Sequence, residues 1–356
     1  MAIVSLQLEN FRTYHRDSFE FSEGVSIIVG PNASGKTNLL EAILLLCEGQ
    51  SFRAKDHELI SHEKDYARIE GLVGIDKRIV LIEHDGIERS TKTHQINTQN
   101  LKRLPPAKRV PVVLFEPEIL QLFQGGPEKR REYMDSLISR TTPGFTTTMR
   151  QYKRVLSQRN ALLKRQQTPK QEEFFAWNVR LSELGGQIAT ARNQLIDNLN
   201  SSINEEYQNI ASKNNNVSLE YLSKISSPSY NTHMLHALEK VFQTDRERGY
   251  TSVGPHRDDL QVLFDGKDAK QVASRGEMRS LVLALKILEL KIVEAAAQKQ
   301  PILLLDDVFS ELDGARRKAL TESIQQYQTF ITTTDADLIV KYFIGACEII
   351  PTNRTA

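Results

Sequence analysis

Cysteine is scarce in this sequence of 356 residues, which contains only Cys47 and Cys347. Both lie in apolar runs, and no Cys and His residues have the spacing of a zinc site. We therefore expect two reduced core thiols in a cytoplasmic protein and no zinc centre.

Long hydrophobic runs, a dominant charge and a targeting segment are also missing. No apolar run approaches the length of a membrane span. The chain begins directly with the strand-like stretch Ile3–Leu8, without the charged and apolar regions of a signal peptide. The net charge is +1, so any basic surface for nucleic acid must be local. These absences predict an untargeted protein with no membrane partner.

What the sequence does contain is a complete phosphate-binding loop of the form G-x-x-x-x-G-K-[ST]. It follows the β-branched run Val25–Val29 and precedes a helix-like run from Asn38 to Leu46, which is the context that such a loop requires. Lys36 is predicted to reach the β and γ phosphates of ATP, and Thr37 to bind Mg²⁺. The alternative is a chance Gly/Ser-rich loop. The predicted nucleotide-binding residues are Gly30, Pro31, Asn32, Ala33, Ser34, Gly35, Lys36 and Thr37.

The chain around this loop is rich in predicted strands. Alternating residues predict a hairpin, further strands follow the first helix, and Asp85-Gly86 predicts a turn. We interpret residues 1–125 as an N-terminal ATPase lobe. Beyond the loop strand, the predicted strands are Ile3–Leu8, Ser18–Phe21, Ala67–Val73, Arg78–Glu83 and Val110–Phe115.

Residues 126–248 are predicted to form a helical arm. A helix over Met149–Gln166 is followed by a turn at Thr168-Pro169. Beyond it, apolar residues recur at alternating spacings of three and four, the pattern of a coiled-coil seam. We interpret this stripe as the core of a short antiparallel pair of helices, about three heptads long. Its members are Phe174, Trp177, Leu181, Leu184, Ile188, Ala191 and Leu195.

A basic stretch overlaps the start of this arm. From Ser136 to Gln171 there are eight basic residues and no acidic one. Such a stretch can neutralise DNA phosphates without reading sequence, or it can be a solvated helix face. Both readings stay open. The residues predicted to contact DNA are Arg150, Lys153, Arg154 and Arg159.

The last part of the chain, residues 249–356, is predicted to form a C-terminal ATPase lobe. The aliphatic strand Ile302–Leu305 ends in Asp306-Asp307, a Walker B pattern. Asp306 is predicted to share Mg²⁺ with Thr37, and Asp307 to act as the general base on the attacking water. Alternatively, the two acids merely cap the next loop.

Two further segments complete the pattern of an ABC-type ATPase. Ser274 and Gly276, at a helix start, have the form of the signature that binds the γ-phosphate held by a second subunit. Ser310–Asp313 fits the D-loop, and Asp313 is predicted to belong to the nucleotide site. We therefore predict an α/β fold: a two-lobed ATPase head into which the arm is inserted.

Several blocks of sequence together resemble the RecF family of bacterial recombination mediators, which is related to the heads of SMC proteins. The resemblance covers essentially the whole chain, including Arg12, which it places among the nucleotide-binding residues. Beyond Gly30–Thr37, the blocks are Leu8–Tyr14, Phe115–Glu118, Gly126–Asp135, Gly254–Leu260 and Leu304–Asp313.

The resemblance implies an ATP-dependent DNA-binding protein of repair and replication. It implies a homodimer that forms with ATP, a weak DNA-dependent ATPase that acts as a timer, and binding to gapped DNA or single-strand/double-strand junctions. It also implies RecO and RecR as partners in recombinase loading.

Two departures from the expected patterns concern the ATPase. Arg275 and Glu277 flank the signature glycine where the family usually has glutamine, and Phe330–Asp335 lacks the switch histidine of transporter ATPases. The missing histidine favours slow hydrolysis. A Q-loop is only a candidate, at Glu116–Gln121.

Two other functions can be compared with this one. The ATPase subunit of a membrane transporter would have a switch histidine and a compact insert, and it would lack the strand that leads into Asn10–Arg12. A DNA clamp that does not hydrolyse ATP is the closer alternative. Intact Lys36, Asp306 and Asp307 disfavour it.

Overall fold

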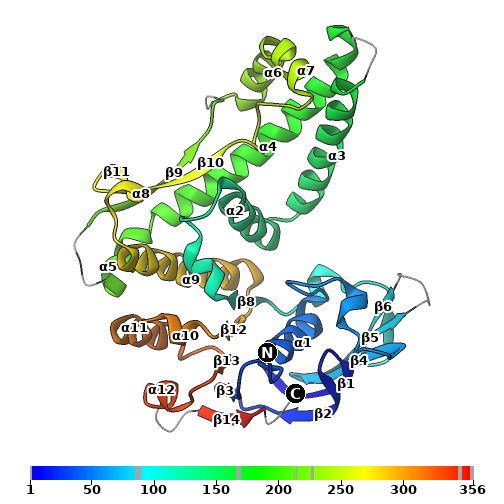
Figure 1. Ribbon diagram of the computed structural model, residues 1–356, viewed down its shortest axis with the longest axis vertical. Coiled ribbons are helices and arrows are strands. Elements are labelled where there is room, and N and C mark those ends of the chain that lie inside the picture. The colour runs from blue at the N-terminus through cyan, green and yellow to red at the C-terminus, as the bar shows by residue number, and fades with distance from the viewer. Residues whose placement is uncertain are drawn as a thin grey trace. The chain divides into compact units, whose positions relative to one another are not determined.

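A computed structural model describes residues 2–84, 90–165, 170–211, 213, 215–225, 228–343 and 347–352 (Figure 1). The chain divides into two compact units. The first unit consists of Met1–Ile119 and Glu289–Ala356, and the second of Leu120–Leu288. No helix within the described ranges is both long and apolar enough to cross a membrane.

The first unit contains two sheets. One is antiparallel, with strand order β2-β1-β4-β5-β6-β7, and the other is parallel, with order β14-β3-β13-β12-β8. The antiparallel strands are β1 (Ile3–Phe11), β2 (Tyr14–Glu20), β4 (Tyr66–Val73), β5 (Asp76–His84), β6 (Ser90–Ile96) and β7 (Gln99–Leu101). The parallel strands are β3 (Val25–Val29), β8 (Val112–Phe115), β12 (Ile302–Asp306), β13 (Thr329–Thr333) and β14 (Cys347–Pro351).

Helix α1 (Lys36–Glu48) lies between these two sheets and contacts strands of both. Its residues from Leu39 to Cys47 are all buried, because the helix is aliphatic on nearly every side and has a sheet to cover it on each. The same hydrophobic cluster includes Leu6 and Ile69 of one sheet and Leu304 and Phe330 of the other. The helix that begins at the phosphate loop is therefore the centre of the core of this unit.

Shorter helices complete the first unit: η1 (Asp56–Leu59), η2 (Pro106–Lys108), the start of η3 (Pro117–Gln121), α10 (Val308–Glu311), α11 (Gly314–Ile324) and α12 (Asp337–Val340). The predicted α/β class is confirmed. The predicted turn at Asp85-Gly86 lies outside the described residues.

The second unit combines helices with a three-stranded antiparallel sheet of order β11-β10-β9. Its strands are β9 (Val217–Leu222), β10 (Asp259–Phe264) and β11 (Lys267–Asp268). Its helices are α2 (Pro127–Thr141), α3 (Phe145–Leu163), η4 (Gln171–Phe174), α4 (Phe175–Asn200), α5 (Ile203–Ala211), α6 (Tyr230–Lys240), α7 (Phe242–Arg248), α8 (Ala269–Val272) and the start of α9 (Arg275–Ala297).

Helix α4 carries the apolar stripe that the sequence predicts, but it contacts more than one partner. Helix α3 packs on it, as do α2, α6 and β9. On the α6 side Gly185 gives Met234 room to pack, because a β-carbon there would lie 2.5 Å from Sδ of Met234 and the methionine side chain would have to move. Helix α4 is therefore buried on two faces. The predicted pairing of two helices accounts for only one of these faces. The predicted turn at Thr168-Pro169 lies outside the described residues.

The division into units differs from the predicted boundaries at 125 and 249. Residues 120–125 and 249–288 pack with the helical unit. The reason is that β10 pairs along its full length with β9, and Arg130 of α2 forms a bidentate ion pair with Asp259 at 2.8 Å. The signature segment around Ser274 therefore belongs to the same compact unit as the arm helices.

Candidate functional site

The phosphate loop joins β3 to α1 and adopts a strained backbone. Gly35 has φ of 96°, which favours glycine, and Ala33 has φ of 65°. The Tyr14 hydroxyl donates a hydrogen bond to the Gly35 carbonyl at 3.0 Å. Pro31, Asn32 and Ala33 are exposed, whereas Ser34 and Gly35 are buried. Residues 31–33 of the loop are therefore exposed, whereas the part around Ser34 and Gly35 is buried and held by Tyr14.

Lys36 is folded back onto the loop. Its Nζ donates to the carbonyl oxygens of Gly30 at 2.8 Å and Pro31 at 2.9 Å. Burial lowers the pKa of Lys36 below its usual value, and the nearby carboxylates of Asp307 and Asp306 only partly offset this. The Lys36 ammonium thus lies against neutral carbonyl groups of the loop. A phosphate bound there would give it an anionic partner.

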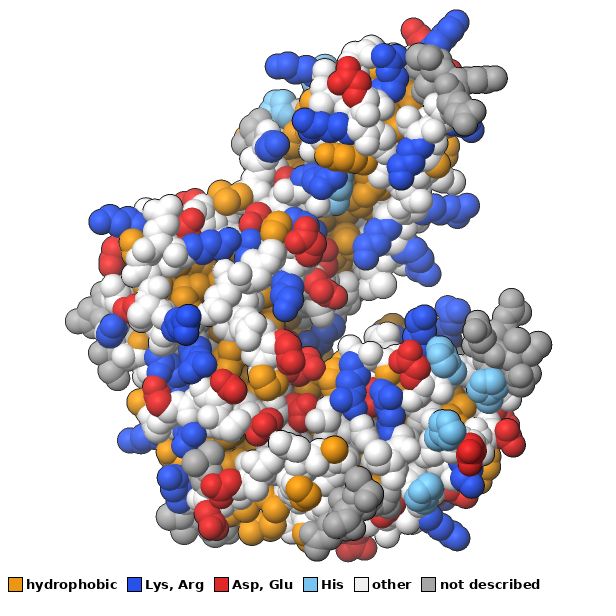
Figure 2. Space-filling view, in the orientation of Figure 1, with side chains coloured by type: hydrophobic (Ala, Val, Ile, Leu, Met, Phe, Trp, Pro, Cys, Tyr) orange, Lys and Arg blue, Asp and Glu red, His pale blue; other side chains and the backbone are white. Residues whose placement is uncertain are grey.

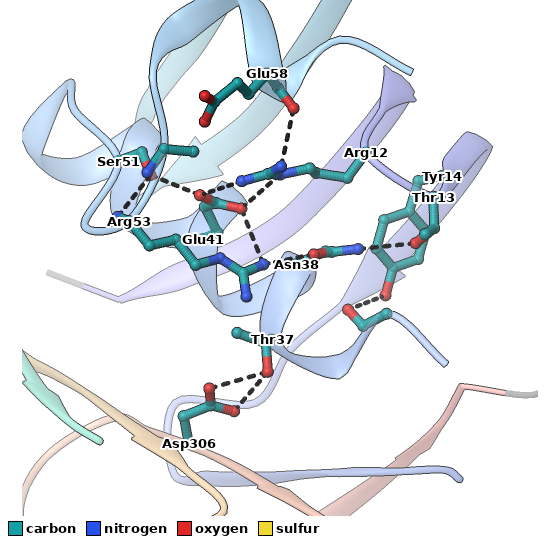
Figure 3. Close-up of polar contacts among 12 residues, drawn as sticks. Arg12, Thr13, Tyr14, Thr37, Asn38, Glu41, Ser51, Arg53, Glu58 and Asp306 are labelled. Carbon is teal, nitrogen blue, oxygen red and sulfur yellow. Dashed lines mark hydrogen bonds and ion pairs between the residues drawn. The ribbon is translucent and has the colours of Figure 1, made fainter. Parts of the chain in front are cut away.

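Thr37 and Asp306 meet although they are 269 positions apart. The Thr37 hydroxyl lies 2.9 Å from both carboxylate oxygens of Asp306 (Figure 3). Thr332 of β13 donates to the same carboxylate at 2.7 Å. A hydroxyl and a carboxylate are the hard oxygen donors that Mg²⁺ prefers, so these residues fit the predicted metal. Among the described residues no cluster of three or more His, Cys, Asp and Glu forms a metal site by itself.

Asp307 is held in a left-handed backbone conformation, with φ of 52°. Its amide donates to the Thr332 hydroxyl at 2.9 Å, and the Ser310 hydroxyl lies 2.6 Å from its carbonyl oxygen and 3.0 Å from its carboxylate. Asp and Asn tolerate this region better than most residues. The carboxylate is therefore fixed immediately after the strand end that carries Asp306.

A cavity of about 510 Å³ is lined by residues of both predicted motifs, although Gly30, Pro31 and Ser34 of the loop are not among them. It also includes part of the candidate Q-loop, because β8 pairs with β12 and their carboxyl ends are adjacent. Phe52 and Arg53 were not predicted to line the nucleotide site. The only sequence signal for them was weak: an arginine that comes soon after the helix of the phosphate loop. The lining residues are Asn32, Ala33, Gly35, Lys36, Thr37, Asn38, Phe52, Arg53, Glu116, Pro117, Glu118, Asp306 and Asp307.

Glu41 of α1 connects this cavity to the β1–β2 turn. Its carboxylate accepts from Arg12 through two bonds, at 2.9 and 3.1 Å, and from Arg53 at 3.2 Å (Figure 3). Ser51 donates to it at 2.5 Å. Burial alone would raise the pKa of Glu41, but these donors outweigh it and the pKa is lowered. Glu41 is 0% exposed and ionised, so it holds both arginines in place.

Arg12 lies next to the cavity lining without being part of it. Its guanidinium binds Glu41 and the Glu58 carbonyl, at 2.9 Å for the latter, and it does not line the cavity. Arg53 does, and it also donates to Asn38 at 2.6 Å. Whether Arg12 binds nucleotide stays a prediction; in this structure Arg53 is the arginine at the cavity.

The signature residues form a capping box at the start of α9. The Ser274 amide donates to the Glu277 carboxylate at 2.8 Å, and the Glu277 amide donates to the Ser274 hydroxyl at 3.3 Å. Lys213 donates to Glu277 at 2.8 Å, and together with Ser274 it lowers the pKa of Glu277 to about 2. Ser274 is exposed, and Gly276 follows in the first turn. The glutamate of this signature therefore caps its own helix.

The predicted D-loop residue also caps a helix. Asp313 accepts from the Arg316 amide at 3.0 Å and forms an ion pair with the Arg316 guanidinium at the start of α11. Its side chain is exposed.

Arg159 corrects the predicted DNA surface. Its side chain is 0% exposed and forms an ion pair with fully buried Asp245 at 2.9 Å. It also donates to Asn178 at 2.9 Å and to Thr251 at 2.7 Å. Burial lowers its pKa, and Asp245 counteracts this. The prediction that Arg159 contacts DNA is wrong because its guanidinium is fully buried and paired with Asp245 inside the fold.

The other three predicted DNA residues, Arg150, Lys153 and Arg154, are exposed on α3. Figure 2 shows Lys and Arg side chains gathered along this helix, which contains no acidic residue. His256, in contrast, is an internal anchor: Tyr152 lies 2.6 Å from its Nδ1, and the Thr251 carbonyl lies 3.0 Å from its Nε2.

A parallel sheet whose strands end in a phosphate loop and a Walker B carboxylate defines a P-loop nucleotide-binding fold. A family model described as "RecF/RecN/SMC N terminal domain" matches residues 2–343. The chain belongs to the RecF family within this group.

Relatives and solved structures agree. "DNA replication and repair protein RecF" of Heliobacterium modesticaldum is 35% identical over 344 residues, covering 94% of this chain and 92% of that protein. The same-named protein of Bacillus cytotoxicus is 35% identical over 352 residues, covering 95% and 93%.

A solved structure of the recombination mediator protein RecF with ATP, described as part of the RecFOR pathway, has a TM-score of 0.82 at 32% identity, covering 94% of this chain and 92% of that one. An SMC head bound to a domain of ScpA has a TM-score of 0.55 at 16% identity, covering 99% and 94%. That likeness concerns the fold alone.

Proposed function

We propose that this protein binds ATP with Mg²⁺ in the cavity of the first unit and hydrolyses it slowly, to control its association with DNA in repair and replication. The observation that carries the proposal is the contact between Thr37 and Asp306, 2.9 Å from hydroxyl to each carboxylate oxygen. It joins the two halves of an ATPase site that the sequence separates. A related protein of 32% identity is described as a complex with ATP.

Each residue has a defined task in this proposal. The amides that open α1 hold the phosphates, and Lys36 exchanges the carbonyls of Gly30 and Pro31 for the terminal phosphates. Thr37 and Asp306 hold Mg²⁺, which neutralises phosphate charge when bound. Asp307, fixed by Ser310, accepts a proton from the attacking water.

The complete site requires a second copy of the chain. Ser274 is exposed at the amino end of α9, a long helix whose first amides and dipole favour an anion. We place the signature of each copy, Ser274 and Gly276, against the γ-phosphate held by the other. An ATP-dependent homodimer follows. Slow turnover, stimulated by DNA, makes the nucleotide a timer for that dimer.

DNA is the proposed macromolecular ligand, bound without sequence preference through exposed α3 residues and preferred at gaps and single-strand/double-strand junctions. A related protein of known structure is described as acting in the RecFOR pathway. We therefore propose RecO and RecR as partners, with recombinase loading in the cytoplasm as the task.

ATP binding, hydrolysis and sedimentation, each with and without gapped DNA, test this function. We expect slow phosphate release that DNA stimulates, and a dimer only with ATP. Lys36→Ala should weaken ATP binding roughly tenfold to a hundredfold, as expected for losing charged hydrogen bonds. Wild-type protein that neither binds ATP nor dimerises with it would overturn the proposal.

A further inference from the structure

The residue that follows β14 lies against the phosphate loop. Strand β14 runs parallel to β3, with Pro351 opposite Val29, so Thr352 comes beside the point where the loop begins. The Thr352 amide donates to the Val29 carbonyl at 2.7 Å. Its side chain is 5% exposed, so it is part of the loop's buried support.

The Thr352 hydroxyl connects the strand end to the loop. It lies within hydrogen-bond distance of the Val29 carbonyl, at 3.0 Å, and of the Ser34 hydroxyl, at 2.8 Å. Either hydroxyl can be the donor of the bond between Thr352 and Ser34. Ser34 is 1% exposed, so its side chain supports the loop from behind.

Thr352 also explains the first glycine of the loop. A β-carbon at Gly30 would lie 2.2 Å from the Thr352 hydroxyl oxygen and 2.7 Å from its carbonyl oxygen. Neither distance is sterically possible without moving one of the two segments. Gly30 is thus required by the close approach of Thr352, whereas Gly35 is required by its positive φ.

We propose that Thr352 is a positioning residue for the phosphate loop: through Ser34 it holds the loop amides where they converge on the phosphates of ATP. The inference rests on the proposed function in that it assumes ATP binding by this loop. It adds a residue from the opposite end of the sequence, which contacts no phosphate itself. The reason for its effect is preorganisation, because a loop that is already fixed loses less entropy on binding.

The test compares Thr352→Val, which keeps the shape but removes the hydroxyl, with Thr352→Ser, which keeps the hydroxyl. ATP affinity is measured by titration, and KM and kcat by phosphate release. We expect Thr352→Val to weaken ATP binding and raise KM about threefold to tenfold, the effect of one hydrogen bond, with kcat little changed. Thr352→Ser should restore wild-type affinity.

Ser34→Ala probes the same bond from the loop side, so the inference stays testable if Thr352→Val fails to fold. It should produce the same loss of affinity, and the double variant should be no worse than either single one. Ile349→Ala is the matched control, since this β14 side chain is 51% exposed, and it should bind ATP normally.

Unchanged ATP affinity in both Thr352→Val and Ser34→Ala would overturn the inference, as would additive losses in the double variant. The proposed function would survive that result, provided that the wild type binds ATP. A wild type that fails to bind ATP would overturn both.

Discussion

Arg159 and Asp245 form a fully buried ion pair, with Nη1 of the arginine 2.9 Å from Oδ2 of the aspartate. The other oxygen of Asp245 accepts from the amide and the hydroxyl of Ser252, at 3.0 and 2.6 Å. The pair thereby ties α3 to α7 and to the segment before β10. It also separates Arg159, which is internal, from Arg150, Lys153 and Arg154, which are exposed on α3.

These exposed side chains give the first prediction. Reversing Arg150, Lys153 and Arg154 to Glu should weaken DNA binding equally for all sequences, because these side chains would contact phosphates. The dependence of log K on log salt should flatten by about 0.9 for each duplex phosphate that the variant no longer neutralises. Titrations at several salt concentrations measure both. Unchanged affinity and an unchanged salt slope would show that DNA does not bind at these α3 residues.

Arg159→Gln is the matched structural variant for that experiment. Removing one member of a buried ion pair costs about 3–5 kcal/mol, so its free energy of unfolding should fall by that order. Denaturant unfolding measures this. A variant as stable as the wild type would show that the Arg159–Asp245 pair does not stabilise the fold.

Asp307→Asn is expected to bind ATP normally and to stop hydrolysis. Asparagine tolerates the φ of 52° at this position, and Asp306 still holds Mg²⁺, so only the base is lost. Phosphate release and ATP titration separate the two effects. Normal turnover would show that Asp307 is not the base.

Ser274→Arg should give a folded monomer that binds ATP but no longer dimerises, because the new side chain would occupy the place of the partner's γ-phosphate. Ser274→Ala is the control for helix capping, which costs about 1 kcal/mol when lost. Sedimentation with ATP distinguishes them. A Ser274→Arg protein that dimerises like the wild type contradicts the composite site.

Glu41→Gln should loosen Arg53 at the cavity and lower stability. Two hydrogen-bonded arginines lose their anionic partner, and a charged hydrogen bond contributes about 1.5–3 kcal/mol. Because both arginines are partly exposed, we expect about 1–3 kcal/mol in total, with weaker ATP binding. Arg53→Gln is the comparison. If it binds ATP like the wild type, Arg53 has no role at the nucleotide.

His256 makes the stability of the helical unit depend on pH. Burial lowers its pKa from 6.5 to about 4, and its two bonds, with Tyr152 and the Thr251 carbonyl, suit the neutral ring. Between these values the unfolded chain binds a proton that the folded chain does not. The stabilisation is therefore complete above pH 6.5 and is lost as the pH falls towards 4.

Melting temperatures at about pH 7.5 and about pH 5, on either side of the ordinary histidine pKa, test this prediction. The wild type should melt at a lower temperature in the more acidic buffer, and His256→Gln should show a smaller difference between the two values. An equal difference in both proteins would assign the pH dependence to other groups, among them buried His94, whose pKa is also lowered to about 4.

The sequence by itself determined the nucleotide loop, the Walker B strand and the α/β class, because each depends on neighbouring residues. Even the meeting of Thr37 with Asp306 was predictable, since parallel strands present their carboxyl ends at one edge of a sheet. The internal position of Arg159 also follows from the helical pattern of the sequence. Arg159 lies four residues after Val155 and seven after Tyr152, on the buried face of α3.

Only the tertiary structure decided the remaining contacts, such as Thr352 with Ser34 and Glu41 with Arg12 and Arg53. No sequence motif indicates which residue each of these side chains contacts. An arginine gives the same local sequence signal whether it binds a carboxylate or a phosphate. These contacts exist because the two sheets close over α1 and bring distant segments to the same loop. A motif consists of residues that are close in the sequence and can be recognised there. The residues that hold the motif in place come from distant segments, and the packing of the whole core determines which they are.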